Sequence, residues 1–315
     1  MVPESPRVLI IDDMEGICGV DHWHAIAHGF DEFEDGRIQI TEDVNAAIRG
    51  LRAAGAGEII VVDAHGSGGA NKNLIPEKLE TGVELHQEPS TRDRLRKALD
   101  RHYDAAVFIG FHAMADTEDG FIPHTITFVP RIKVNGIPVG ETAITAYTLG
   151  EYGIPVVMVT GDQALVREAR RFLPGVEAVK VKTSSSKRET KSLPTVEARE
   201  LIEEAATRAV SKIGDSRLLT VNKPVEIEMS FPNEDYADIA ARLPRTTRIG
   251  NISVSYTAEN WAEALTFIYA AIDFSSQVDT KALVGELRKL PGSEETSFRA
   301  MMTMIERTLK IKLDA

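Results

Sequence analysis

Histidine and acidic residues stand at the ends of short apolar segments of this sequence, where a buried strand would not normally end. Asp13 and Glu15 come after VLIID, and His65 comes after IIVVDA. His112 follows AVFIGF, and His124 precedes the apolar segment TITFV. Imidazole and carboxylate groups together form a ligand set suited to zinc or a similar divalent ion. The sequence therefore predicts polar groups that converge at one edge of a sheet.

The carboxylates in this set each have a simpler explanation as well. Asp13 and Glu15 are two residues apart, so a continuing strand would place both on one side, where they repel unless a proton or cation lies between them. Alternatively, Asp13 caps a turn, in competition with Asp12, and Glu15 is solvated. Glu141 follows Gly140 at a predicted helix start, where the helix dipole favours any carboxylate. Only the joint placement of these residues favours a metal.

Single histidines are more often structural than metal-binding, so the pattern carries more weight than its members. His65 and His112 both end apolar segments, and this raises the expectation that they are ligands. Asp63 is a candidate partner that holds the ring of a ligating histidine. A further group of histidines resembles a zinc cluster, but we expect a loop or helix near the site entrance there; it comprises His22, His24 and His28.

Two other stretches resemble ligand-binding segments but have simpler structural explanations. Residues 66–73, GSGGANKN, lack both the GK[ST] ending and the GxGxxG spacing, so nucleotide binding is not favoured and the glycines are expected to let the loop approach the site. A basic stretch is expected to be a solvated loop, with pore lining or binding of a substrate carboxylate as the alternative; it comprises Lys180, Lys182, Lys187, Arg188 and Lys191. Cys18 is not expected to be a nucleophile.

The elements that must position these side chains alternate between strands and helices. Strands are predicted at residues 7–11, 58–63, 105–111 and 155–160, and helices at 41–54, 93–101, 141–151 and 162–171. This alternation predicts an α/β fold with a mostly parallel central sheet flanked by helices. In such sheets ligands bind at the carboxyl ends of the strands, which is where the candidate ligands fall.

The remaining segments predict a hairpin and a second domain. Residues 124–139 are expected to form two antiparallel strands around Asn135-Gly136, a strong hairpin signal. Residues 196–213 predict a helix, and the segments after it predict two strands and two helices of a smaller C-terminal α/β domain. We place a metal-binding α/β domain at residues 1–178, the smaller domain at 179–274 and a helical extension at 275–315.

Composition limits the class of protein. The 315 residues carry a net charge of −12, which argues against nucleic-acid binding as the main function. A single cysteine excludes an internal disulfide and fits a reducing compartment, although it also fits a cysteine-poor exported protein. Neither a signal peptide nor an apolar stretch of about 20 residues for a membrane helix is recognised. We therefore expect a cytoplasmic protein with no membrane partner.

Four motifs in a fixed order provide a more specific signal. They are DMEGICG, DAH, GFHAMADTEDGFIPHT and NGIPVGE. With them the chain resembles the DppA-type D-aminopeptidases, a family of zinc metallopeptidases, from about residue 7 to about residue 273. It departs from the family pattern at Ile11, where a serine is common, and in the residues after about 274.

The resemblance implies a set of roles for the candidate residues. The family's metal ligands fall on Asp13, Glu15, His65, His112 and Glu141. Its catalytic histidine falls on His124. It further implies two zinc ions per chain with Asp13 bridging them, short peptide substrates, and a homo-oligomer, a decamer whose active sites face an internal cavity.

The function expected on these grounds is a zinc-dependent aminopeptidase that releases N-terminal residues from short peptides by two-metal hydrolysis. The preference for D-residues rests on the resemblance alone. One alternative is another binuclear metallohydrolase, an amidase or phosphoesterase, using the same ligands. A small-molecule binding protein without metal is the other alternative, and metal content would distinguish it.

Overall fold

The computed structural model describes residues 2–66, 72–87, 91–127, 130–276 and 278. The chain divides into two compact units. The first unit contains Met1–Phe128 and Pro138–Asn222, and the second contains Val129–Ile137 and Lys223–Ala315. All the candidate site residues belong to the first unit.

A mostly parallel sheet forms the centre of the first unit, as predicted. Its strands in spatial order are β3 (Glu84–His86), β2 (Ile59–Asp63), β1 (Val8–Asp12), β4 (Ala105–Ile109), β7 (Val156–Asp162), β8 (Glu177–Ser184) and β9 (Thr190–Ser192). All neighbouring pairs are parallel except β8 with β9. β1, β2 and β4 are buried along their whole length, which explains why their segments are continuously apolar.

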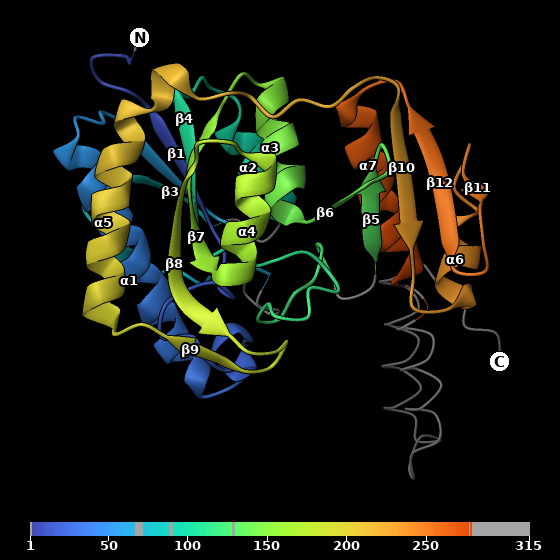
Figure 1. Cartoon of the computed structure of the whole chain (residues 1–315), viewed down its shortest axis with the longest axis horizontal. Coiled ribbons are helices and arrows are strands. Elements are labelled where there is room, and N and C mark those ends of the chain that lie inside the picture. Colours follow the sequence, from blue (N-terminus) through green and yellow to red (C-terminus); the bar gives the residue numbers. More distant parts are fainter. Residues whose placement is uncertain (1, 67–71, 88–90, 128–129, 277, 279–315) are drawn as a thin grey trace, which may run out of the picture. The chain divides into compact units, whose positions relative to one another are not determined.

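Helices cover both faces of this sheet (Figure 1). α1 (Glu32–Ala53) and α5 (Thr195–Ser211) pack on each other over one face, where they form a core with Val8 and Ile10 of β1. Leu9 and Ile11 are equally buried but point to the opposite face. On that side lie α2 (Thr91–Ala98), α3 (Glu141–Glu151) and α4 (Gln163–Phe172).

Helix α1 begins nine residues before the predicted start at residue 41. Its buried stripe includes Ile40, Val44, Ile48 and Leu51, with the spacing of one helix face. Its first turns are mostly polar and contain Gly36, so they show little apolar periodicity. A side chain at Gly36 would meet the carbonyl oxygen of Ala25, which shows that this glycine permits a close approach of the preceding loop. Three short 3-10 helices complete the elements described for the first unit: η1 (Trp23–Ile26), η2 (Pro76–Lys78) and η3 (Ile213–Asp215).

The second unit is a smaller α/β unit with an antiparallel sheet. Its sheet has the order β11 (Thr247–Arg248), β12 (Ser253–Ala258), β10 (Val225–Ser230), β5 (Arg131–Val134) and β6 (Ile137–Val139). α6 (Glu234–Ala240) and α7 (Trp261–Ser275) complete it. In β10 buried and less buried residues alternate, as expected for a strand with one covered face.

The structure corrects the predicted domain boundaries. The boundary between residues 178 and 179 falls inside β8, which pairs with β7 in the first sheet, and α5 packs on α1. Residues 179–222 therefore belong to the first unit, whereas residues 129–137 join the second because β5 pairs with β10. Strand pairing between distant segments decides these assignments, and composition does not reveal it. The predicted extension at 275–315 lies outside the described residues except for 275, 276 and 278.

The predicted hairpin is shorter than expected. β5 and β6 flank Asn135 and Gly136, whose positive φ angles of 48° and 76° suit a two-residue hairpin turn. Residues 124–127 form only an isolated bridge between Thr125 and Thr127. This segment is part of the long loop after β4, and it carries His124.

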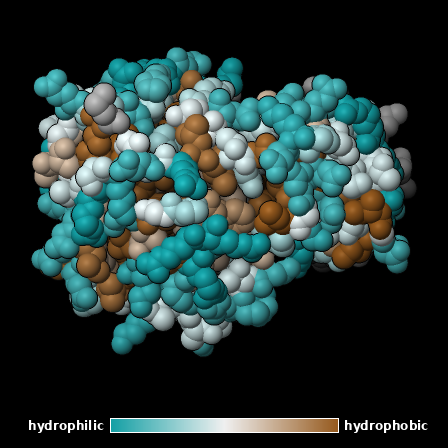
Figure 2. Space-filling model, turned by 45° about the horizontal axis from the view of Figure 1, so that its top comes forward, coloured by the Kyte–Doolittle hydropathy of each residue, from teal (hydrophilic) through white to brown (hydrophobic). Residues whose placement is uncertain are grey.

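On the face that Figure 2 shows, hydrophilic residues predominate and hydrophobic residues lie between them in smaller groups. Among the helices of the described residues, none is both long and apolar enough to cross a membrane.

Candidate metal centre

The register of three neighbouring strands brings the candidate ligands together. Asp12, the last residue of β1, pairs with Asp63 of β2 and with Ile109 of β4. All three strands run parallel, so the segments that follow them leave the sheet at the same edge. Asp13, His65 and His112 are therefore neighbours, as the strand-end argument predicts.

A tight turn after β1 places Glu15 beside Asp13. The backbone N–H of Gly16 donates to the carbonyl oxygen of Gly110 at 2.8 Å. A side chain at Gly16 would lie 2.0 Å from the carbonyl oxygen of Phe111, and Gly110 itself has φ of +74°. Both glycines are needed because two backbones meet here without room for a Cβ. The strand ends before Asp13, so a turn and not strand periodicity makes the two carboxylates converge.

His65 faces the two carboxylates of this turn. Its Nδ1 lies 2.8 Å from Asp13 Oδ1 and 3.2 Å from Glu15 Oε2. On the other side of the ring, Nε2 lies 2.9 Å from the carbonyl oxygen of Ile26. A carbonyl can only accept, so Nε2 carries the proton and Nδ1 is the nitrogen available to a metal.

His112 faces the other oxygen of Asp13. Its Nε2 lies 3.4 Å from Asp13 Oδ2 and 3.2 Å from Glu141 Oε1, and its Nδ1 lies 3.0 Å from the carbonyl oxygen of Ala113. Glu141 is the first residue of α3 and also accepts a hydrogen bond of 2.6 Å from the backbone N–H of Ile126. The loop of His124 is thereby tied to the start of α3.

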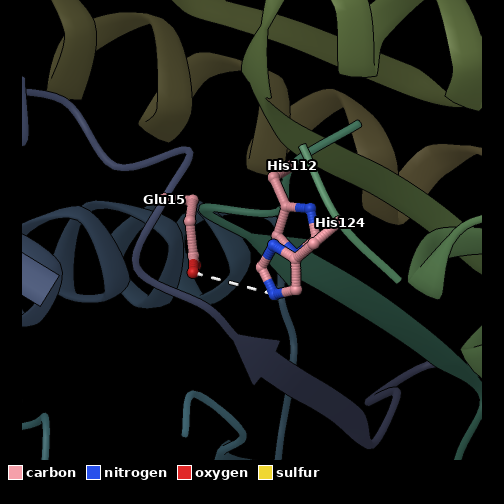
Figure 3. A group of neighbouring side chains, drawn as sticks. All are labelled: Glu15, His112 and His124. Carbon is pink, nitrogen blue, oxygen red and sulfur yellow. Dashed lines mark ion pairs between the residues drawn. The ribbon is translucent and has the colours of Figure 1, made fainter. Parts of the chain in front are cut away.

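His124 completes the centre from the loop after β4. Its Nε2 lies 3.6 Å from Glu141 Oε1 and 4.0 Å from Glu15 Oε1. Its ring stacks on that of His112, with centroids 3.9 Å apart and planes inclined by 11°. Figure 3 shows the two parallel rings and the carboxylate of Glu15 directed toward His124. Its Nδ1 lies 2.9 Å from the carbonyl oxygen of Ile122.

The three histidines share one arrangement. In each ring one nitrogen faces a backbone carbonyl and the other faces carboxylates. This is the usual environment of a metal-binding histidine, because the carbonyl fixes the tautomer and the orientation of the ring. Among the described residues, three groups of side chains have ligand atoms close enough to hold an ion: Asp13 with Glu15 and His65, Asp13 with His112 and Glu141, and Glu15 with His112 and His124.

Two atoms at the centre lack the hydrogen bonds that burial normally requires. Glu15 Oε2 and His112 Nε2 are buried without a hydrogen-bond partner among the described residues. Each lies within 3.2 Å of an oppositely polar atom but not in hydrogen-bond geometry. Buried polar atoms left this way are costly, and bound cations would satisfy them. The residues present therefore fit a metal ion.

Comparison with known proteins identifies the family. The family model described as D-aminopeptidase matches residues 7–270. This chain belongs to the D-aminopeptidase family. It is 31% identical over 254 residues to the D-aminopeptidase of Bacillus subtilis (strain 168), which covers 80% of this chain and 91% of that protein. The membership and the enzyme class predicted from the four motifs are thus confirmed.

A solved structure from the same family has the same fold. It is the zinc-dependent D-aminopeptidase DppA of Bacillus subtilis, described as a self-compartmentalizing protease. The two chains align with a TM-score of 0.80 at 28% identity, over 85% of this chain and 97% of that one. The predicted α/β fold is confirmed by this match.

The carboxylates of this family member's centre carry opposed pKa shifts. Burial and the charge of Glu15 raise the pKa of Asp13 to about 7. Burial opposes ionisation of Glu15 too, but the nearby charges of His65, His112 and His124 together hold the pKa of its carboxyl well below the ordinary value. One proton is thus retained where two carboxylates adjoin, and a cation would replace it.

The histidines divide in the same way. Burial disfavours the charged form of both His65 and His112, but the carboxylates around them raise the pKa of each ring well above the ordinary value. Burial and the charge of His112 lower the pKa of His124. Without metal, protons on His65 and His112 compensate the carboxylates, so metal binding should release protons.

The structure corrects one expectation about a residue around the centre. The carboxylate of Asp63 accepts hydrogen bonds from Asn73 and Gln87, whereas the ring of His65 is held by the carbonyl oxygen of Ile26 and not by Asp63. The histidines at 22, 24 and 28 belong to no metal-binding group among the described residues. Most of the glycine-rich stretch 66–73 lies outside the described residues.

Two buried charged residues near the centre were not found from the sequence. Glu168 of α4 is 6% exposed and accepts a hydrogen bond of 2.7 Å from the backbone N–H of Met114; burial raises its pKa to about 7. Lys182 of β8 is fully buried, and burial lowers its pKa to about 8. The sequence places Lys182 in a basic, serine-rich stretch typical of solvated loops, and only the sheet pairing shows otherwise.

Proposed function

We propose that this protein is a zinc-dependent aminopeptidase that removes D-residues from the amino terminus of short peptides, with two zinc ions per chain. The observation that carries the two-metal part is that two of the ligand groups share Asp13, one through each of its carboxylate oxygens. Zinc itself, and the D-specificity, come from the family and from the zinc dependence of the Bacillus relative.

In this proposal five residues hold the ions. Asp13 would contribute to both sites, with Glu15 and His65 completing one and His112 and Glu141 completing the other. Zinc ions held in such a pair polarise a carbonyl group and make water a stronger nucleophile at neutral pH. The carbonyl contacts of His65 and His112 fix the orientation of both rings, so their other nitrogens would be directed toward the ions.

His124 is the proposed catalytic residue. Its Nδ1–H donates to Ile122, so the pair of electrons on Nε2 faces the interior of the centre between Glu15 and Glu141. Because its pKa is lowered, the ring is neutral at neutral pH and can accept a proton at Nε2. The imidazolium formed in this way can then return the proton to the leaving amine, or stabilise the developing oxyanion.

The remaining parts of the proposal concern substrate and assembly. A free amino terminus is required because a metal or a carboxylate must receive it, and short peptides are preferred over folded proteins. We further propose a homo-oligomer, a decamer as in the family, since the Bacillus relative is described as self-compartmentalizing. A cytoplasmic location remains a prediction from the sequence.

One zinc-loaded sample tests the function with four kinds of substrate: D-Ala-D-Ala, its L,L counterpart, the N-acetylated forms of both, and a phosphoester. We expect cleavage of the free D,D dipeptide only. Equal cleavage of the acetylated peptide would exclude an aminopeptidase and favour an amidase, and turnover of the phosphoester alone would favour a phosphoesterase. Cleavage of only the L,L form would keep the enzyme class and remove the D-specificity.

A further inference from the structure

Lys182 occupies an unusual environment for a lysine. Its side chain is fully buried in β8, opposite Asp162 of β7 in the sheet register. Lysine is almost never fully buried unless it is paired, because the ammonium group loses its hydration. Among the described residues no carboxylate forms an ion pair with Lys182. The charges of Asp21, Asp162 and Asp43 act on the ammonium from beyond ion-pair distance, and its direct contacts are with groups that connect it to the metal centre.

The first contact is with the turn that carries the metal ligands after β1. Lys182 Nζ donates to the carbonyl oxygen of Glu15 at 2.9 Å and to the carbonyl oxygen of Val20. The ammonium thus links the two ends of the segment from Glu15 to Val20. A lysine has three N–H donors that rotate together, so one side chain can satisfy two carbonyls that leave the backbone in different directions.

The second contact is with the loop that carries His124. The ammonium lies 5.0 Å from the centroid of the Phe121 ring, at cation–π distance. Phe121 is held in place by a hydrogen bond of 2.8 Å from its backbone N–H to Asp162 Oδ2. It precedes His124 by three residues in the same loop, so its position constrains that of His124.

We propose that Lys182 is a positioning residue that fixes Glu15 and His124 relative to each other by binding the two loops that carry them. An apolar side chain of the same length would fill the space but leave the carbonyls of Glu15 and Val20 without a donor. The backbone of Glu15 would then turn toward water or another donor, and its carboxylate would move with it. The inference rests on the proposed function, since Glu15 is a proposed zinc ligand and His124 the proposed catalytic residue.

Lys182→Met tests this in the full-length protein, because it keeps an unbranched side chain and removes only the ammonium. We expect the zinc affinity, measured by competition with a chelator, to fall roughly 10- to 100-fold, as for other residues that orient ligands. With zinc at saturation, kcat for D-Ala-D-Ala should fall more than KM changes. After cobalt substitution the visible absorption bands should differ from those of the wild type, which a loss of stability alone would not produce.

Lys180→Met is the matched control, since Lys180 lies two residues earlier on the same strand and is exposed. It should equal the wild type in zinc affinity, kcat and cobalt spectrum. A folded Lys182→Met protein with wild-type values in all three would overturn the inference. Wild-type protein that neither binds zinc nor cleaves peptides would instead contradict the proposed function, so the two failures are distinct.

A second pair of variants covers the case in which Lys182→Met does not fold. Lys182→Gln keeps an N–H donor on a side chain one atom shorter and is measured in the same way. Phe121→Leu keeps Lys182 and an apolar side chain but removes the aromatic face under the ammonium. It should lower kcat while zinc content stays at the wild-type level, and an unchanged kcat would overturn the link between Lys182 and His124.

Discussion

The rings of His112 and His124 are stacked face to face, with centroids 3.9 Å apart and planes inclined by 11°. Two stacked imidazoles cannot both carry a proton charge without strong repulsion. The structure resolves this by giving His112 the closer carboxylate contacts, with Asp13 and Glu141, and leaving His124 with a lowered pKa. Two adjacent histidines are thereby suited to different tasks, one to binding a metal and the other to moving a proton.

Replacing His124 should separate these two tasks. We expect His124→Ala to keep its zinc but to lose activity by about 10²- to 10⁴-fold, the usual contribution of a proton-transfer group. Elemental analysis and turnover of D-Ala-D-Ala measured on the same sample check both halves. His102→Ala, which alters an exposed histidine, is the control and should match the wild type.

Loss of zinc from the His124→Ala protein would lead to a different conclusion about the role of His124. The ring of His124 also belongs to a group with Glu15 and His112 whose atoms could hold an ion. A metal-depleted variant would therefore make His124 a ligand and not the catalytic residue. Near-normal turnover would exclude both roles.

Binding of both ions should depend on Asp13, because one of its carboxylate oxygens faces His65 and the other faces His112. We expect about two zinc ions per chain in wild-type protein purified without chelator, and close to none in Asp13→Asn. Ligands that bind only the folded state raise its stability. A chelator should therefore lower the thermal midpoint of the wild type and leave that of the variant unchanged. One zinc ion retained by Asp13→Asn would show that the carboxylate serves a single site.

Glu168 should make the stability of the metal-free protein fall as the pH rises. Its folded-state pKa of about 7 exceeds the ordinary 4.5, so between these values the native state keeps a proton that the unfolded chain releases. The stabilisation is complete below the lower value and is lost through this window. Glu168→Gln, which imitates the protonated acid, should equal the wild type near pH 4 and exceed it near pH 8 by up to roughly 3 kcal/mol.

Urea unfolding of both proteins across this range measures the difference. All other titrating groups are shared, so the difference isolates residue 168. Glu200→Gln, at an exposed position of α5, is the control and should follow the pH profile of the wild type. A difference between Glu168→Gln and the wild type that does not vary with pH would show that Glu168 is ionised in the native state.

Cys18 should be inert in the native protein. Its side chain is buried with Sγ 3.3 Å from the carbonyl oxygen of Leu193, and burial together with the charge of Asp43 raises its pKa to about 11. Thiolate is the reactive form, so a disulfide reagent at about pH 8 should label no thiol in native protein and one per chain after unfolding. Rapid labelling with loss of activity would assign this thiol to an accessible part of the site.

The sequence by itself determined the parts that depend on local order. Continuous apolar segments alternating with amphipathic ones specify buried parallel strands and covering helices, as β1, β2 and β4 confirm. Polar residues at the ends of parallel strands must meet at one edge, which brings Asp13, His65 and His112 together without any further information. The hairpin at Asn135-Gly136 likewise follows from two residues that tolerate positive φ.

Only the tertiary structure decided which atoms face one another. Asp63 and Glu15 are both acidic residues near strand ends, but a turn held by Gly16 against Gly110 directs only the second toward His65. The same basic stretch contains exposed Lys180 and buried Lys182, because the side chain of Lys182 reaches the carbonyl oxygens of Glu15 and Val20, which lie far earlier in the chain. Contacts between segments distant in sequence depend on packing and register, and residue type alone does not encode them.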